Sequence, residues 1–245
     1  MQSTVSVHLL PSLLDPAELT DTTVVVIDVL RATSTITAAL AAGATAITPF
    51  AEVAAARQQA AELTTPVLLG GEREGKRING FDLGNSPCEY RPEVVKDQTI
   101  LFTTTNGTRA LAACHQARRI LLAGFVNLTA VVDQVSNVSN LHILCAGTDA
   151  KVSQEDVLLA GALTEMLSRC NKPFTAGNDS ARLAQQAWSY HDRQANDLEQ
   201  LLRGGRGGQN LLNLGLDADI AFCATVDQFD LVPSLDRQSG TITRG

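Results

Sequence analysis

Carboxylates, arginines and small hydrogen-bonding residues gather in a few polar turns of this chain. The candidate carboxylates are Asp28, Glu72, Asp82, Glu155 and Asp156, and the candidate cations are Arg31, Arg73 and Arg109. The remaining candidates are Thr33, Ser34, Asn85, Ser86, Thr105, Asn106, Gly107 and Thr108. Carboxylates with other oxygen donors suit Mg²⁺, and arginines suit bidentate contact with phosphate, carboxylate or sulfonate. The set predicts a metal-assisted site for a small polyanion.

Each of these residues also has a structural interpretation. Asp28 ends an apolar run and could cap the next helix through a backbone N–H. Glu155 and Asp156 stand in the first turn of an expected helix, where acids complement the helix dipole. Arg109 could be a solvated helix residue, and Asn106-Gly107 could be a turn. The residue types alone leave both interpretations open.

The stretch "LLGGEREGKRINGFDLGNSP" (Leu68–Pro87) nearly spells a nucleotide-binding P-loop. A P-loop needs Ser or Thr after its Lys and a helix that holds the phosphates. Arg77 follows Lys76 here, and the next residues carry glycines and a proline. The chain also lacks a second Asp in "DVLRAT", a G-x-S-x-G elbow and an HExxH motif, and none of its four histidines lies in a polar turn. These familiar phosphate and hydrolase mechanisms are therefore disfavoured.

Apolar strands alternate with helical stretches along the chain, which predicts an α/β protein with a mostly parallel sheet. "TVVVIDVL" (Thr23–Leu30) is typical of a strand buried on both faces. Helices are expected around 181–188 and 193–202, and "DIAFCATV" (219–226) and "FDLVP" (229–233) are expected to be short strands. The polar turns follow strands, and in open α/β sheets such turns gather at the carboxyl ends of the strands, where ligands bind.

Composition bounds the function. The chain has 245 residues, 44% of them hydrophobic and 18% charged, with a net charge of −7. An acidic surface disfavours nucleic acid and anionic membranes, and no apolar run is long enough for a membrane helix. The five cysteines are scattered without CxxC spacing, and no secretory signal is visible. We therefore expect a cytoplasmic protein with reduced thiols and no cysteine-based zinc site.

The ordered motifs "DVLRATSTI", "GEREGKRINGFDLGNSP", "TTTNGTRAL", "CAGT…QED…AG" and "GGQNLLNLGLDADIAFCA" resemble the 2-phosphosulfolactate phosphatase (ComB-like) family over nearly the whole chain. The resemblance implies a single domain over residues 1–245, with a layered α/β/α fold made of two intertwined, similar units. It also implies Mg²⁺-dependent hydrolysis of 2-phospho-3-sulfolactate to 3-sulfolactate and phosphate, a step towards coenzyme M. One departure is local: a glycine is expected after "CAGT", but Asp149 stands there.

The resulting hypothesis assigns Mg²⁺ to Asp28, Glu155 and Asp156, with Glu72 or Asp82 assisting. Arg31, Arg73 and Arg109 neutralise the anions, and the helix starts after Arg31 and Thr105 offer backbone donors. The predicted catalytic residues are Asp28, Arg31, Glu72, Asp82, Asn106 and Arg109. The predicted substrate-binding residues are Arg31, Thr33, Ser34, Arg73, Asn85, Ser86, Thr105, Asn106, Gly107, Thr108 and Arg109.

Three alternatives stay open. Asp28 could accept the phosphoryl group covalently instead of serving the metal. The substrate could be another phosphorylated 2-hydroxy acid. The loops could also hold a phosphorylated ligand without hydrolysis, as in a sensor. The high apolar fraction favours a homo-oligomer.

Overall fold

The computed structural model of the chain describes residues 2–194 and 197–245. Its strands are β1 (Thr4–His8), β2 (Thr23–Ile27), β3 (Ala46–Phe50), β4 (Leu68–Arg73), β5 (Lys76–Arg77), β6 (Thr99–Thr103), β7 (Arg119–Ala123), β8 (Asn140–Cys145), β9 (Thr175–Ala176), β10 (Pro233–Leu235) and β11 (Ile242–Arg244). In this part of the chain they form one 11-stranded sheet in the order β5-β4-β6-β3-β11-β10-β7-β2-β8-β1-β9.

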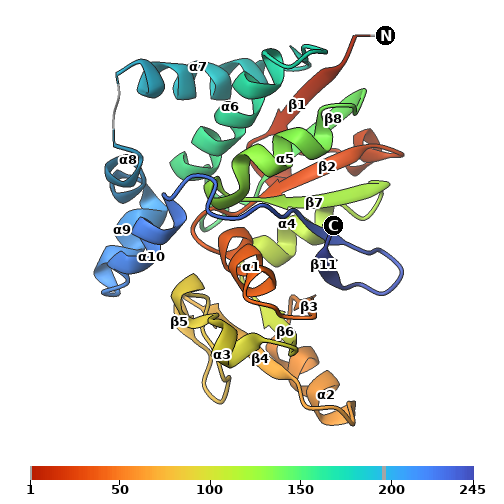
Figure 1. The fold of residues 1–245 in the computed structure, drawn as a ribbon, viewed down its shortest axis with the longest axis vertical. Coiled ribbons are helices and arrows are strands. Elements are labelled where there is room, and N and C mark those ends of the chain that lie inside the picture. Colours follow the sequence, from red (N-terminus) through yellow and green to blue (C-terminus); the bar gives the residue numbers. More distant parts are fainter. Residues whose placement is uncertain (1, 195–196) are drawn as a thin grey trace.

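The sheet contains two groups of parallel strands. β4, β6 and β3 make one group, and β7, β2, β8, β1 and β9 make the other. The antiparallel hairpin of β10 and β11 joins them, pairing with β7 on one side and β3 on the other. The chain starts in the second group, crosses to the first for β3 to β6, and returns for β7 and β8. This mixed sheet with interleaved halves confirms the predicted α/β class (Figure 1).

Helices fill most of the connections between the strands. The α-helices are α1 (Ala32–Ala41), α2 (Val53–Glu62), α3 (Pro92–Val95), α4 (Gly107–Ala113), α5 (Leu128–Val135), α6 (Gln154–Ser168), α7 (Asp179–Arg193), α8 (Leu198–Gly204), α9 (Arg206–Asn213) and α10 (Asp217–Cys223). Short 3-10 helices are η1 (Pro11–Leu13), η2 (Pro16–Leu19), η3 (Pro87–Glu89) and η4 (Phe125–Asn127).

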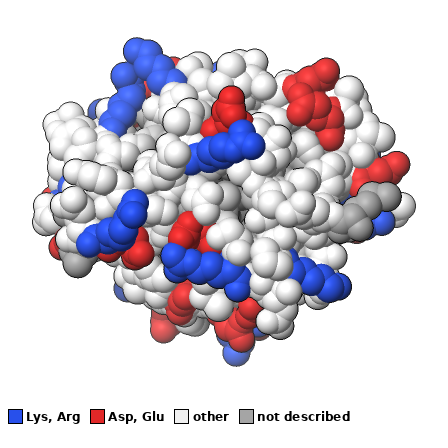
Figure 2. Space-filling model, turned by 90° about the horizontal axis from the view of Figure 1, so that it is seen from above, with Lys and Arg blue, Asp and Glu red and all other residues white. Residues whose placement is uncertain are grey.

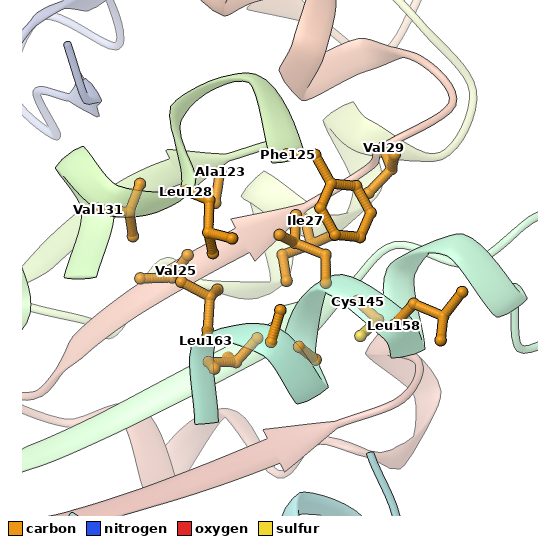
Figure 3. Close-up of a cluster of buried hydrophobic side chains, with 14 of the residues drawn as sticks. Val25, Ile27, Val29, Ala123, Phe125, Leu128, Val131, Cys145, Leu158 and Leu163 are labelled. Carbon is orange, nitrogen blue, oxygen red and sulfur yellow. The ribbon is translucent and has the colours of Figure 1, made fainter. Parts of the chain in front are cut away.

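Helices cover both faces of the sheet because its central strands are apolar on both sides. Along β2, Val25 and Ile27 pack into one core cluster and Val24 and Val26 into the other. The first cluster is closed by α5, α6 and α7, and the second by α1 and α4. Figure 3 shows Val25 and Ile27 between side chains of α5 and α6. Each fully buried aliphatic side chain contributes about 1.5–3 kcal/mol, which favours this three-layer arrangement.

Three segments differ from the sequence-based expectations. The part of "DIAFCATV" up to Cys223 belongs to α10 rather than to a strand, because Asp219, Ile220 and Cys223 share one buried helix face. Most of "FDLVP" is a connection, since β10 begins only at Pro233. One helix was expected around 193–202. In the structure α7 ends at Arg193 and α8 begins at Leu198, and residues 195–196 lie outside the described residues.

Among the described residues, no helix has the length and apolar character needed to cross a membrane. On the face drawn in Figure 2, acidic and basic side chains are interspersed rather than gathered into one basic stripe.

Candidate active site

A cavity of about 740 Å³ lies where strands of both parallel groups end. Its lining comes from the turns after β2, β6 and β8, from the β4–β5 hairpin, from Asn85 and from α9. In Figure 1, α9 and the β4–β5 hairpin lie on the same side of the molecule. The carboxyl ends of parallel strands thus meet as expected for a ligand crevice in an open α/β sheet.

Asp28 follows β2 directly and lines the cavity, although only 7% of it is exposed. Its Oδ1 accepts the N–H of Ala32 at 3.2 Å, in the first turn of α1. A Cβ on Gly107 would stand 3.0 Å from Oδ2 of Asp28, so the start of α4 packs closely against this carboxyl group. Burial raises the pKa of Asp28 to about 8; the charge of Asp156 adds to the rise, and the Ala32 hydrogen bond opposes it. Asp28 can therefore exchange a proton near neutral pH.

Asp156 lies buried in the first turn of α6, where its two oxygens accept backbone N–H groups. Oδ1 accepts from Val29 at 3.0 Å and Oδ2 from Gly147 at 2.9 Å. Burial raises the pKa of Asp156 to about 6, against the lowering effect of these hydrogen bonds. Asp156 thereby ties the turn after β2 to the turn after β8, and it does not line the cavity.

Glu155 is buried next to Asp156 in the first turn of α6. The Oε2 atom of Glu155 has no hydrogen-bond partner among the described residues. Burial raises the pKa of Glu155 to about 8, and the charges of Asp156 and Asp28 add to the rise. A Cβ on Gly207 would stand 2.0 Å from its Oε1, so α9 approaches this carboxylate closely.

The donor atoms in this region fit Mg²⁺. Buried oxygens without a partner in the described chain are Oε2 of Glu155, Oδ1 of Asn85 and Oγ1 of Thr104. However, the carboxylate oxygens of Asp28, Glu155 and Asp156 do not all lie within 4.8 Å of one another. Mg²⁺ keeps several waters and needs only one or two carboxylates, so a closed cage of three acids is not required.

Glu72, at the end of β4, holds two loops of the cavity together. Its Oε2 accepts the N–H of Gly75 at 2.7 Å, and its Oε1 accepts the N–H of Thr105 at 3.0 Å. The β4–β5 hairpin is thereby fixed against the turn after β6. No helix follows Gly75, since β5 begins at Lys76, and this agrees with the rejection of a P-loop.

Two arginines line the cavity in fixed positions. Arg31 is 4% exposed; its Nη1 meets Asp219 Oδ2 at 2.6 Å and its Nη2 donates to the carbonyl of Gly75 at 2.9 Å. Arg73 donates to the carbonyls of Glu72 and Ala51. Both guanidinium groups are held before a ligand arrives, which lowers the entropic cost of binding an anion.

Seven of the predicted residues line this one cavity: Asp28, Arg31, Glu72, Arg73, Asn85, Thr105 and Asn106. Gly107 borders Asp28 without lining it.

The other predicted residues lie elsewhere or point away from the cavity. Four hydroxyls are engaged inside the protein: Thr33 Oγ1 with Ala123 O, Ser34 Oγ with Val29 O, Ser86 Oγ with Asp219 and Thr108 Oγ1 with Thr104 O. Asp82 is exposed and accepts the N–H of Leu69 at 2.8 Å. Arg109 is exposed on α4 and does not line the cavity.

Asp219 is a site residue that the sequence analysis missed. It is 1% exposed, and it holds both Arg31 and Ser86. The available signal was an acid at the start of an apolar run, since a buried carboxylate requires a partner. Its partner is 188 positions away in the chain, so no local pattern could supply it.

The turn after β8 was expected to carry an extra charge near the site at Asp149, but no residue of that turn or of α9 was among the candidate site residues. Thr148 and Asp149 line the cavity, as do Asn210 and Asn213 of α9. Asp149 adopts φ 53°, the left-handed region that favours the glycine expected there, and its carboxylate pairs with Arg206 at 3.0 Å.

Comparison with known proteins identifies the family. A family model described as 2-phosphosulpholactate phosphatase matches residues 8–238. The chain belongs to the 2-phosphosulfolactate phosphatase family. These proteins are phosphoric monoester hydrolases.

Several relatives carry the name "Probable 2-phosphosulfolactate phosphatase". The one from Caldanaerobacter subterraneus subsp. tengcongensis is 43% identical over 224 residues, covering 89% of this chain and 89% of its own. The one from Pseudothermotoga lettingae is 42% identical over 209 residues, covering 85% and 87%. The one from Synechococcus sp. (strain JA-3-3Ab) is 42% identical over 219 residues, covering 85% and 86%.

Proposed function

We propose that this phosphatase hydrolyses 2-phospho-3-sulfolactate to 3-sulfolactate and phosphate in a Mg²⁺-dependent reaction. Family membership supports the substrate. The observation that supports a need for metal is the excess of acidic over basic residues in the cavity lining. Arg31 and Arg73 are the cations among the described lining residues, against the acids Asp28, Glu72, Glu74 and Asp149.

Such a cavity would repel a substrate that carries phosphate, sulfonate and carboxylate groups. A divalent cation between the acids and the phosphate reverses that repulsion. Asp28 and Glu155 are the proposed holders, with the unpartnered oxygens of Asn85 and Thr104 in the same region. When bound, Mg²⁺ would supply charge neutralisation at the phosphoryl oxygens and orientation of water. Asp156 and Glu72, whose oxygens already accept backbone N–H groups, are better assigned to positioning.

The chain's own groups perform the remaining work. Arg31, locked by Asp219, binds the phosphoryl group, and Arg73 binds a second anionic group of the substrate. Thr105 and Asn106 offer polar contacts from the turn after β6. Asp28 would either hold the metal beside the attacking water or attack phosphorus itself. Trapping of ³²P-labelled protein separates the two routes.

The proposed setting is the cytoplasm, where the product would lead towards coenzyme M. The cysteines Cys88, Cys114, Cys145, Cys170 and Cys223 are all free, as a reducing compartment requires.

The test is phosphate release by the purified protein from 2-phospho-3-sulfolactate, with Mg²⁺ and then with EDTA. A panel of other phosphorylated 2-hydroxy acids runs beside it. Mg²⁺-dependent release that is fastest with the sulfonate supports the proposal. Faster release from another ester would move the substrate assignment, and no release from any ester would favour a ligand sensor.

A further inference from the structure

Two buried histidines and a glutamate meet away from the cavity. His8 ends β1, and His142 is the third residue of β8. Ser6 pairs with His142 and His8 with Leu144 in the parallel register, so the two imidazoles lie on the same face of adjacent strands. Glu18 comes from η2, which precedes β2 in the chain. Three separate segments therefore contribute one side chain each.

The geometry points to a metal site. We propose that His8, His142 and Glu18 bind one divalent transition-metal ion, with Zn²⁺ as the reference ion. One ligand atom from each residue lies within 4.8 Å of the other two, and this is the single such group of histidine, cysteine or acidic side chains in the part of the chain that the structure describes.

The two imidazoles already face each other at a metal-compatible distance. His8 Nε2 and His142 Nδ1 are 2.9 Å apart, and the rings stack within 5° of parallel. Tetrahedral zinc with Zn–N bonds of about 2.0–2.1 Å separates two nitrogens by roughly 3.3 Å. With a shift of a few tenths of an ångström, and with the N–H of the donating ring moved to its other nitrogen, a metal ion could take the place of the proton between the rings.

The state of the three side chains suits ligation. Both histidines are 5% exposed, and a neutral imidazole offers one nitrogen lone pair to a metal ion. Glu18 is exposed at the surface, and its carboxylate makes no hydrogen bond or ion pair with the other described residues. Two histidines and one carboxylate with an open fourth position form a ligand set that zinc uses.

Ligand chemistry separates this site from the cavity. Imidazole favours Zn²⁺, Cu²⁺, Ni²⁺ or Fe²⁺, whereas the oxygen-rich cavity favours Mg²⁺. The ion would join β1 and β8 to η2 and so fasten the segment that packs over this face, where Leu14 and Leu19 are buried. Because the unfolded chain does not hold the three ligands together, metal binding would also stabilise the fold.

The experiment uses the full chain after chelator treatment and dialysis. Co²⁺ is titrated while visible absorption is recorded, and Zn²⁺ is titrated while the thermal unfolding midpoint is followed. We expect one equivalent of Co²⁺ with tetrahedral absorption bands and an upward shift of the midpoint with Zn²⁺. Glu18→Gln, at an exposed position, should weaken binding by about tenfold or more. His142→Gln should abolish the bands.

Two controls keep the result specific. His115→Gln removes an exposed histidine in the turn after α4 and should bind like the wild type. Asp28→Asn removes a cavity carboxylate and should keep the Co²⁺ bands. If His142→Gln does not fold, Glu18→Gln decides. Absence of binding by the wild type, or wild-type affinity in Glu18→Gln, would overturn the proposal.

Discussion

At the scale of single residues, the site contains buried acids, Asp28 in the cavity wall and Glu155 outside the lining, whose charged forms are disfavoured by burial. Asp28 and Glu155 have pKa values raised to about 8, chiefly by burial. Their neighbour Asp156 differs because two backbone N–H groups satisfy its oxygens. Burying acids in this way lowers the stability of the protein unless a cation binds them. Buried acids with perturbed pKa values are typical of functional sites.

Replacing Asp28 by Asn tests the centre of this arrangement. Turnover should fall on the order of 10³-fold, because a positioned charged group at the reacting phosphate is lost. The circular dichroism spectrum should be unchanged. Asp82→Asn is the matched control, since Asp82 is exposed outside the cavity, and it should retain wild-type turnover. Wild-type phosphate release by Asp28→Asn would remove Asp28 from the mechanism.

Asp219 permits a second test at this scale. Without the Asp219 carboxylate, Arg31 loses the 2.6 Å contact that fixes its guanidinium at the cavity wall. We predict that Asp219→Asn lowers kcat/KM by roughly 10–100-fold, since a misplaced arginine stabilises the phosphoryl transition state poorly. The control is Asp217→Asn on the same helix, where Asp217 makes an exposed pair with Arg203. Equal kinetics for the two variants in a steady-state assay would contradict a positioning role for Asp219.

At the scale of elements, α9 shapes the cavity through close backbone packing. Gly207 faces Glu155 so tightly that a Cβ would stand 2.0 Å from Oε1, whereas a Cβ on Gly204 would meet nothing within 4 Å. We predict that Gly207→Ala destabilises the protein by about 1–3 kcal/mol, because the clash must be relieved by moving α9 or the carboxylate. Phosphatase activity should fall with it.

Gly204→Ala is the matched control, because Gly204 is a nearby glycine at the last position of α8. It should leave stability within about 0.5–1 kcal/mol of the wild type or raise it, since alanine favours helix over glycine. Urea unfolding and phosphate release measure both variants. Equal stability of the two alanine variants would show that α9 is free to move away from Glu155.

The element scale also shows what the sequence could predict. The long apolar strands and their following helices were identifiable because β2, β6, β7 and β8 are buried runs with polar turns at their ends. β1 was missed although its five residues alternate between polar and apolar types, which is a strand pattern. α10 was mistaken for a strand because a short apolar run does not distinguish the two by periodicity.

The candidate site was predictable to a similar extent. Residues at strand ends, such as Asp28 and Asn106, meet because parallel strands share one carboxyl edge. The hydroxyls of Thr33 and Ser34 could turn to either side of their helix, and packing turned them towards backbone carbonyls. The role of Asp219 depends on tertiary contact with Arg31, which sequence spacing does not encode.

At the scale of the whole molecule, the cavity lies where the two parallel groups and α9 converge, so site and fold share the same buried acids. This coupling predicts a pH dependence of stability. The pKa values of Asp28 and Glu155 are about 8 in the folded protein and near 4 in the unfolded chain. Between these values the folded protein binds more protons, so stability falls as the pH rises towards 8.

The measurement is urea unfolding in EDTA from about pH 7 to about pH 8.5, above the ordinary histidine pKa of about 6.5, so that the buried histidines contribute only a few tenths of a kcal/mol. Stability of the wild type should fall by about 1–3 kcal/mol over this range. Asp28→Asn should show a shallower fall and be the more stable protein at the upper end, because it has one acid fewer to ionise. Mg²⁺ should offset the loss in the wild type by favouring the ionised carboxylates. A wild-type stability that rises with pH, or an equal slope in Asp28→Asn, would show that these acids are not held protonated by the fold.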